Sequence, residues 1–121
     1  MVAGELAGHK SNMKNPIVEI DGSRIVDWDS FHDVFAEAFG FPEFYGRNMN
    51  AWIDCLTSLD EGMNRIQVEP GRVAVIQINH LEQFAERCPE QYAALVECTA
   101  FINWRRIEQG EEPVIALSFY E

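Results

Sequence analysis

The chain has 121 residues, enough for one domain whose core can fold without a metal ion or disulfide bonds. Its formal net charge of −11, from 9 Lys and Arg against 20 Asp and Glu, disfavours binding to nucleic acid or to anionic lipid. Three cysteines without Cys-x-x-Cys spacing indicate neither a zinc site nor a disulfide framework, and we expect no cofactor. No apolar run is long enough to span a membrane and no signal-peptide pattern opens the chain, so we expect a cytoplasmic protein. The sequence does not determine the oligomeric state, and we expect a monomer.

The first patterned segment begins at Pro16. Residues 1–15 mix Gly, Asn, Lys and Ser without a sustained period, which predicts a flexible N-terminal tail before a single domain over residues 16–121. Ile17 to Ile20 is short and rich in β-branched residues, and the turn pair Asp21-Gly22 closes it, as is typical of a strand.

A helix is predicted next, capped by Asp27 or Asp29 and ended by Gly40. Large apolar residues recur along it at helical spacing, which favours packing in a core over a ligand-binding aromatic box. These residues are Trp28, Phe31, Val34, Phe35, Ala38 and Phe39. We interpret His32, on the same helix, as a packed or surface histidine rather than a catalytic one.

The stretch from Phe41 to Asp60 is the most informative part of the sequence. A turn-rich loop carries the aromatic pair Phe44-Tyr45, and Asn48 is a good N-cap for the helix that follows. The apolar stripe of that helix predicts its buried face, made of Met49, Trp52, Ile53, Leu56 and Leu59. Asn50 and Asp54 lie four residues apart and off this stripe, so we expect one exposed surface with two rings, an amide, a carboxylate and a helix N-terminus.

Two strands and two helices are predicted in the remainder. The near-continuous apolar run from Val73 to Ile78 favours a strand covered on both faces. A short helix, residues 79–87 with Asn79 as its cap, and a long helix from Pro89 to about Gly110 precede a last strand, Val114 to Phe119.

Strands that alternate with helical crossovers indicate an α/β fold, here a single small three-stranded parallel sheet packed with about four helices. Near the end of the long helix, we interpret Arg105 and Arg106 as solvated side chains that favour the negative end of the helix dipole.

The central stretch resembles the barstar family, intracellular protein inhibitors of barnase-type ribonucleases. The resemblance is carried by the aromatic pair, Gly46, Asn48, Ala51 and the run Asp54-Cys55-Leu56-Thr57, in the family's order and spacing. Flanking features fit from about Pro16 to Ser118. The resemblance implies a barstar-like fold and a partner-binding surface made of Phe44, Tyr45, Gly46, Arg47, Asn48, Asn50, Ala51 and Asp54.

This resemblance implies an inhibitor that blocks a basic extracellular or toxin-type ribonuclease at its active site, as an immunity protein does. The chain departs from the family pattern at positions that belong to the inhibitory surface. In the family, the positions of Arg47, Asn50 and Arg105 are usually acidic. The position of Phe44 is often Tyr, and the position of Ile53 is usually aromatic. We therefore expect a divergent nuclease rather than barnase, or another basic partner bound by a non-inhibitory barstar-like module.

A third hypothesis is that the protein is an enzyme, and few residues of the sequence support it. His9, His32 and His80 lack the spacing of a metal-ligand set. Cys55 is a candidate nucleophile, but no histidine lies near it in sequence, and a buried thiol on a helix is the more common case. The expectation is a binding protein without catalytic activity.

Overall fold

The computed structural model describes residues 15–61 and 65–121. The predicted tail therefore lies outside the described residues, apart from Asn15, whose side-chain Oδ1 accepts a hydrogen bond from the backbone N–H of Val73 at 3.0 Å. Within the described ranges, no helix combines the length and the apolar character needed to cross a membrane.

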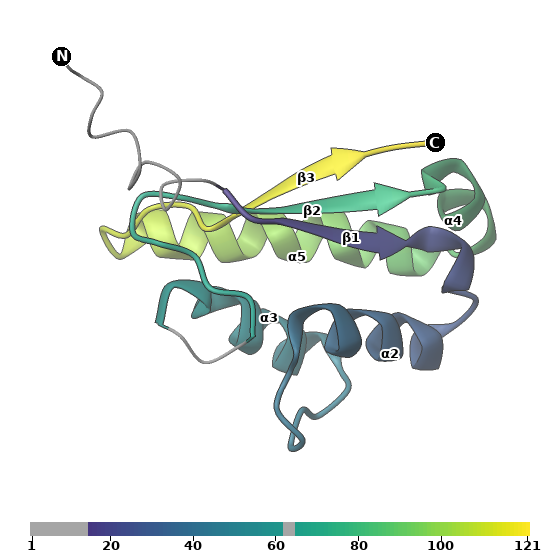
Figure 1. Ribbon diagram of the computed structural model, residues 1–121, viewed down its shortest axis with the longest axis horizontal. Coiled ribbons are helices and arrows are strands. Elements are labelled where there is room, and N and C mark those ends of the chain that lie inside the picture. The colour runs from purple at the N-terminus through teal and green to yellow at the C-terminus, as the bar shows by residue number, and fades with distance from the viewer. Residues whose placement is uncertain (1–14, 62–64) are drawn as a thin grey trace, which may run out of the picture.

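Three parallel strands form one sheet in the order β1-β2-β3, and four α-helices and two short 3₁₀ helices accompany them in the described part of the chain (Figure 1). The elements, in chain order, are β1 (Ile17–Asp21), η2 (Gly22–Arg24), α2 (Trp28–Phe39), α3 (Met49–Thr57), η3 (Leu59–Glu61), β2 (Ala74–Asn79), α4 (Leu81–Arg87), α5 (Pro89–Glu108) and β3 (Ile115–Phe119). The predicted α/β fold with a small parallel sheet and four helices is confirmed.

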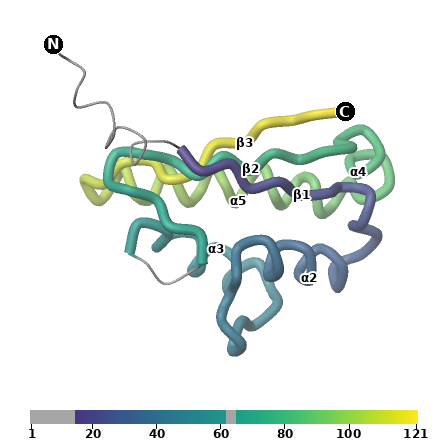
Figure 2. Tube along the Cα trace, in the orientation of Figure 1, coloured from purple at the N-terminus to yellow at the C-terminus, as the bar shows by residue number. Residues whose placement is uncertain are grey.

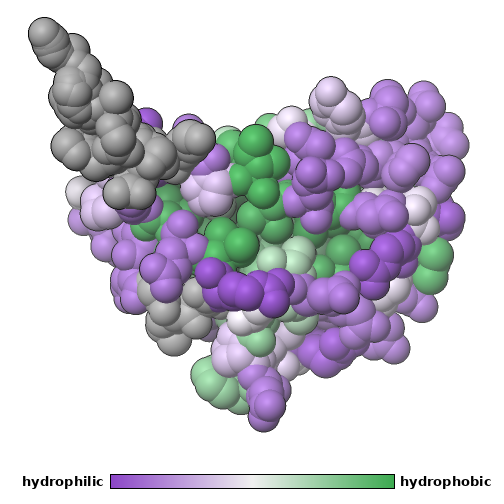
Figure 3. Space-filling view, viewed as in Figure 1, coloured by the Kyte–Doolittle hydropathy of each residue, from purple (hydrophilic) through white to green (hydrophobic). Residues whose placement is uncertain are grey.

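The sheet is packed on one face. Figure 2 shows α2, α3 and α5 on one side of the three strands, and burial along β2 alternates, with Ala74, Ile76 and Ile78 buried and the residues between them only half-buried. The prediction that this strand is covered on both faces is therefore wrong. Figure 3 shows apolar side chains over the strands, because even the outward positions of β2 include a valine.

The core lies between the inward face of the sheet and helices α2, α3 and α5. Phe31 and Phe35 of α2 are fully buried, and the Phe35 ring meets the Trp52 ring of α3 edge-on at 5.6 Å between centroids. The prediction that the α2 aromatics belong to the core is confirmed for the three phenylalanines, while Trp28 is only half-buried at its edge.

Local capping chemistry sets both ends of α2. Asp27 forms a capping box with Ser30, and Gly40 ends α2 in the left-handed region at φ 69°. The predicted cap of α4 is wrong: Asn79 is the last residue of β2, and its amide donates to Glu19 Oε1 across the sheet at 3.1 Å. The helix starts after His80, whose φ is 56°.

Arg106 is buried at the end of α5, which corrects the interpretation of this residue as solvated. Its guanidinium makes a two-pronged contact with Asp60, at 2.7 Å (Nη2 to Oδ2) and 3.3 Å (Nη1 to Oδ1). It also donates to the backbone carbonyls of Thr57 and Glu112. Arg106 thus ties α5 to the end of α3, a long-range contact that a helix-dipole argument does not predict.

Candidate protein-binding surface

The loop between α2 and α3 projects from the end of the molecule opposite the sheet (Figure 1). The backbone N–H of Tyr45 donates to the carbonyl of Pro42 at 2.9 Å, which closes a turn with Glu43 and Phe44 at its centre. The Phe44 side chain is 82% exposed. An aromatic ring at the tip of a closed turn offers apolar contact area to a partner, and the loop does not have to rearrange to expose it.

Tyr45 points the other way, into the protein. Its ring packs against Phe41 at 4.7 Å between centroids, and its hydroxyl is hydrogen-bonded to Nδ1 of His32, a residue that is only 4% exposed. Burial raises the pKa of the Tyr45 hydroxyl, so the group stays protonated. The structure thus separates the two predicted rings: Phe44 is presented to solvent, and Tyr45 mainly anchors the loop.

Arg47 fastens the loop to α2. Its backbone adopts the left-handed region at φ 55°, and its guanidinium pairs with Asp33 at 2.9 Å and with Asp29 at 3.3 Å. Hydrogen bonds to both carboxylates raise the pKa of the guanidinium. Arg47, expected as a partner-binding residue, is already held by two acids of its own chain.

Asn48 caps α3 as predicted. Its Oδ1 accepts a hydrogen bond from the backbone N–H of Ala51 at 2.8 Å. Gly46 lies against the first turn of the helix: a Cβ atom placed on it would be 3.6 Å from the Ala51 Cβ. The loop and α3 therefore form one packed unit.

Asn50 and Asp54 are both exposed on α3, as their spacing predicts. Trp52 and Leu56 are fully buried on the opposite side, which fixes the rotation of the helix. No cation of the described residues pairs with Asp54. The carboxylate is thus available to a partner and stands on a helix that packing holds in place.

Arg105 lies on the same side of the molecule as the end of α3. Its guanidinium donates to Thr57 Oγ1 at 3.0 Å and stands 5.2 Å from the centre of the Phe101 ring. Thr57 follows Asp54 by three residues, so it occupies a neighbouring place on the helix surface. The interpretation of Arg105 as a solvated side chain at the helix terminus is wrong, because a hydroxyl and a ring fix this cation in place.

The acids and the histidine of α2 that hold the loop were not predicted as part of the site. Asp29, His32 and Asp33 have the three- and four-residue spacing of one helix surface, a signal visible in the sequence. Nothing local identifies Tyr45 and Arg47 as their partners, because the contacts span 13 to 18 residues.

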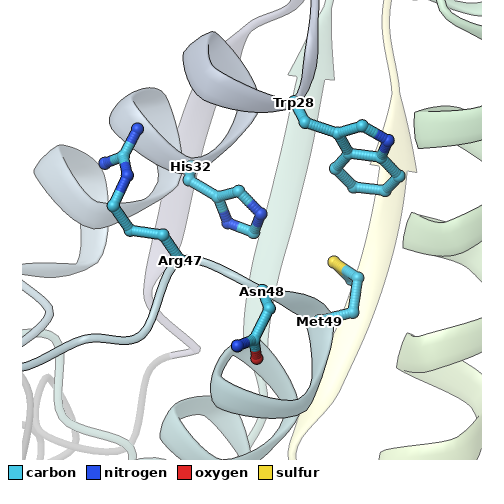
Figure 4. Close-up of a pocket in the computed structure, with 5 residues that line it drawn as sticks. All are labelled: Trp28, His32, Arg47, Asn48 and Met49. Atoms are coloured by element: carbon cyan, nitrogen blue, oxygen red, sulfur yellow. The ribbon is translucent and has the colours of Figure 1, made fainter.

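A pocket of about 250 Å³ opens beside the contact of His32 with Tyr45, between α2 and the start of α3 (Figure 4). It is lined by Trp28, His32, Arg47, Asn48 and Met49.

The described residues hold no cluster suited to binding a metal ion. Across residues 15–61 and 65–121, no three His, Cys, Asp or Glu side chains are grouped so as to bind a metal ion. Burial and the neighbouring Asp54 carboxylate raise the pKa of the Cys55 thiol, which is the opposite of nucleophile activation.

Comparison with known protein families matches residues 15–118 to the family described as Barstar (barnase inhibitor). The match covers most of the chain and includes the loop, α3, the first two strands and all but the last residue of β3.

The chain belongs to the barstar family.

Barstar-family proteins are inhibitors rather than enzymes, and their partners are ribonucleases of the barnase type. No curated protein matches the chain. In this barstar-family protein, three residues of this region differ in state: Arg47 is paired with α2, Asn50 is exposed and neutral, and Arg105 is held between Thr57 and Phe101.

Proposed function

We propose that this barstar-family protein inhibits a ribonuclease by placing the Asp54 carboxylate in the cationic cleft that otherwise holds the substrate phosphate. The exposure of Asp54 on a rigid helix, without a cation partner among the described residues, is the observation that supports this proposal. A ribonuclease needs Arg, Lys or His side chains around the scissile phosphate, and these groups form charge-assisted hydrogen bonds with a carboxylate equally well. The carboxylate offers no bond to cleave, so the occupied site is blocked.

Phe44 supplies the apolar part of the proposed contact. Buried aromatic anchors surrounded by weaker contacts carry much of the binding energy in protein interfaces. Because Tyr45 and Arg47 fasten the loop to α2, ordering Phe44 on binding costs little conformational entropy. Tyr45, Arg47, Gly46 and Asn48 support this surface by positioning it.

The proposed nuclease is a divergent one rather than barnase. Arg105, fixed between Thr57 and Phe101, adds a positive charge on the side of the molecule that carries Asp54. A cationic rim opposite Arg105 would be repelled, whereas an acidic or neutral group there would be accepted. The cytoplasm of the producing cell is the proposed place of action, in keeping with cysteines that form no disulfide bond within the described residues.

The test is calorimetric titration with the ribonuclease encoded beside this protein's gene, and with barnase as a comparison. We expect Asp54→Asn to weaken binding of the cognate enzyme at least tenfold, about 1.4 kcal/mol, because the shape is kept and the charge is lost. The melting temperature should change little, since surface substitutions usually shift stability by less than about 0.5 kcal/mol.

Glu86→Gln is the matched control, because it removes an exposed acid from α4, away from the loop and α3. It should leave the affinity unchanged. Equal affinities of the Asp54→Asn variant and the unaltered protein would refute the proposal.

A second function is favoured by Asn50 and Arg105, which reduce the negative charge of the α3 side. The protein would then bind a basic partner without blocking catalysis. An RNA-cleavage assay separates the two functions: tight capture of a nuclease that still cleaves at its full rate supports the binding module, and loss of cleavage supports the inhibitor.

A further inference from the structure

The pocket between α2 and the start of α3 contains one polar group that is nearly buried and still has bonding capacity. His32 is 4% exposed, and its ring points into the gap between Trp28 and Met49 (Figure 4). Nδ1 is bonded to the Tyr45 hydroxyl, whereas Nε2 has no hydrogen-bond partner among the described residues. Asn50 and Asp54 do not line this pocket, so it adjoins the surface proposed for the nuclease through Arg47 and Asn48 but does not include the proposed Asp54 contact.

The other polar side chains that line the pocket are already engaged. Asn48 accepts from the backbone of Ala51 and donates to the carbonyl of Gly46. Arg47 is held by two carboxylates of α2. The indole Nε1 of Trp28 donates to Glu90 Oε1 at 3.2 Å. A ligand in the pocket therefore meets the His32 Nε2 atom, apolar ring surface and the Met49 thioether.

The contact with Tyr45 decides which His32 nitrogen carries the proton. A phenolic hydroxyl has one proton to donate, and His32 Nδ1 is its hydrogen-bond partner among the described residues. If Nδ1 were protonated, the half-buried Tyr45 proton would lose the imidazole nitrogen as its acceptor, and the nearby Cys55 sulfur is a much weaker one. The favoured arrangement has Tyr45 donating to Nδ1, so a neutral His32 carries its proton on Nε2 and points a donor into the pocket.

We propose that this pocket binds a flat, uncharged group with a carbonyl oxygen, which accepts a hydrogen bond from His32 Nε2–H while its apolar body lies against Trp28 and Met49. The volume of about 250 Å³ is below that of usual drug-sized sites, roughly 300–1,000 Å³, and suits a single ring or a short side chain. Asp29, Asp33 and Glu90 around the pocket outnumber Arg47, which disfavours an anion. The Nε2–H donor disfavours a cation.

The tautomer is the first point to test, and it needs no variant. Two-bond ¹H–¹⁵N correlation of the imidazole in the unaltered protein, at a pH where His32 is neutral, distinguishes a protonated Nε2 from a protonated Nδ1. We expect protonation at Nε2. Protonation at Nδ1 would overturn the proposal, because the pocket would then face an acceptor.

Ligand binding is tested with benzamide, followed by NMR shifts of the His32, Trp28 and Met49 signals. Benzamide should bind at least tenfold more tightly than ethylbenzene, benzoate or protonated benzylamine, which lack the neutral carbonyl. Equal binding of benzamide and ethylbenzene, or no saturable shift at His32, would refute the proposal. A protein amide and a free small ligand share this chemistry: tighter binding of N-acetylphenylalanine amide than of benzamide assigns the pocket to a protein partner, and the reverse order to a free ligand.

Two variants separate the hydrogen bond from the shape of the pocket. Tyr45→Phe keeps the ring that packs on Phe41 but removes the hydroxyl that sets the tautomer, so both tautomers should appear and benzamide should bind more weakly. His32→Phe should abolish the preference for benzamide over ethylbenzene. Tyr92→Phe is the control, because Tyr92 is also half-buried but packs against Phe84 and Phe119 and does not line the pocket; it should change neither result.

Discussion

At the scale of single residues, the histidine beneath the loop makes stability depend on pH. Burial lowers the pKa of His32, with a contribution from Arg47, while Asp29 and Asp33 act in the opposite direction. In the unfolded chain the imidazole titrates near its usual value of about 6.5. As the pH falls below about 6.5 toward the lowered folded pKa, the unfolded state binds more protons and folding loses free energy, whereas above that range His32 is neutral in both states.

We therefore predict that the free energy of unfolding, measured in urea, decreases between about pH 7 and pH 5 more in the unaltered protein than in His32→Gln. Glutamine cannot take up a proton, and every other titrating group is common to both proteins. The same pH slope in the two proteins would show that His32 does not contribute.

A second prediction concerns the pair between Arg106 and Asp60. The Arg106 side chain is 5% exposed, and removing Asp60 leaves its buried charge with backbone carbonyls and the more distant Glu111 carboxylate, 3.8 Å from Nη1. Asp60→Ala should lower the free energy of unfolding by about 3 kcal/mol, the usual scale for a broken buried pair.

Glu37→Ala supplies the contrast, because the pair between Arg24 and Glu37 lies on the surface. It should cost less than about 1 kcal/mol. Chemical denaturation of both variants checks the difference, and similar losses would mean that burial does not govern the strength of these pairs.

At the scale of elements, the loop from Phe41 to Asn48 depends on α2 as much as on α3. The Arg47 pairs to Asp29 and Asp33 are exposed, so they contribute little to global stability, but they restrain the backbone of the loop. Arg47→Ala should speed amide hydrogen exchange of the loop residues while changing the free energy of unfolding by less than about 1 kcal/mol. Arg24→Ala, which breaks the exposed pair between Arg24 of η2 and Glu37 of α2, should leave loop exchange unchanged; faster exchange in both variants would contradict this assignment.

The elements show what could be predicted from the sequence and what could not. Helical periodicity and capping residues predicted α2, α3 and α5, because these signals depend on neighbours within four residues. The prediction that Asn79 caps α4 failed because an asparagine can also end a strand. Here its amide donates a hydrogen bond to Glu19 of β1. The sequence of β2 could not show that helices cover only one face of the sheet. The strand has a valine on its outward face, which gives the sequence pattern of a strand buried on both faces.

The exposure of the two polar side chains on α3 was predicted, but the contacts that hold the loop were not. The spacing of Asn50 and Asp54 was enough to place both side chains on the exposed side of α3. The inward turn of Tyr45 and the fixed positions of Arg47 and Arg105 depend on contacts across 13 to 48 residues. Pattern within one element carries no information about such contacts.

At the scale of the whole molecule, the charge of −11 creates a field that attracts a basic partner before contact. Association of the protein with its cognate nuclease should slow as NaCl is raised, because the screening length falls from about 30 Å at 0.01 M to about 10 Å at 0.1 M. Dissociation should change far less, since it depends on contacts already formed. Stopped-flow measurement of both rates is the check, and an association rate independent of salt would rule out electrostatic steering.

The attachment of the loop to α2 also has a consequence for protein engineering. Because Arg47 in the loop pairs with Asp29 and Asp33, and Tyr45 bonds to His32, the segment from Asp27 to Thr57 carries the loop together with these supports and the cap of α2. A chimaera that receives only residues 41–48 from this chain would inherit the tip without the residues that brace it. Transfer of recognition between homologous scaffolds should therefore succeed with the whole helix-loop-helix segment and fail with the loop alone.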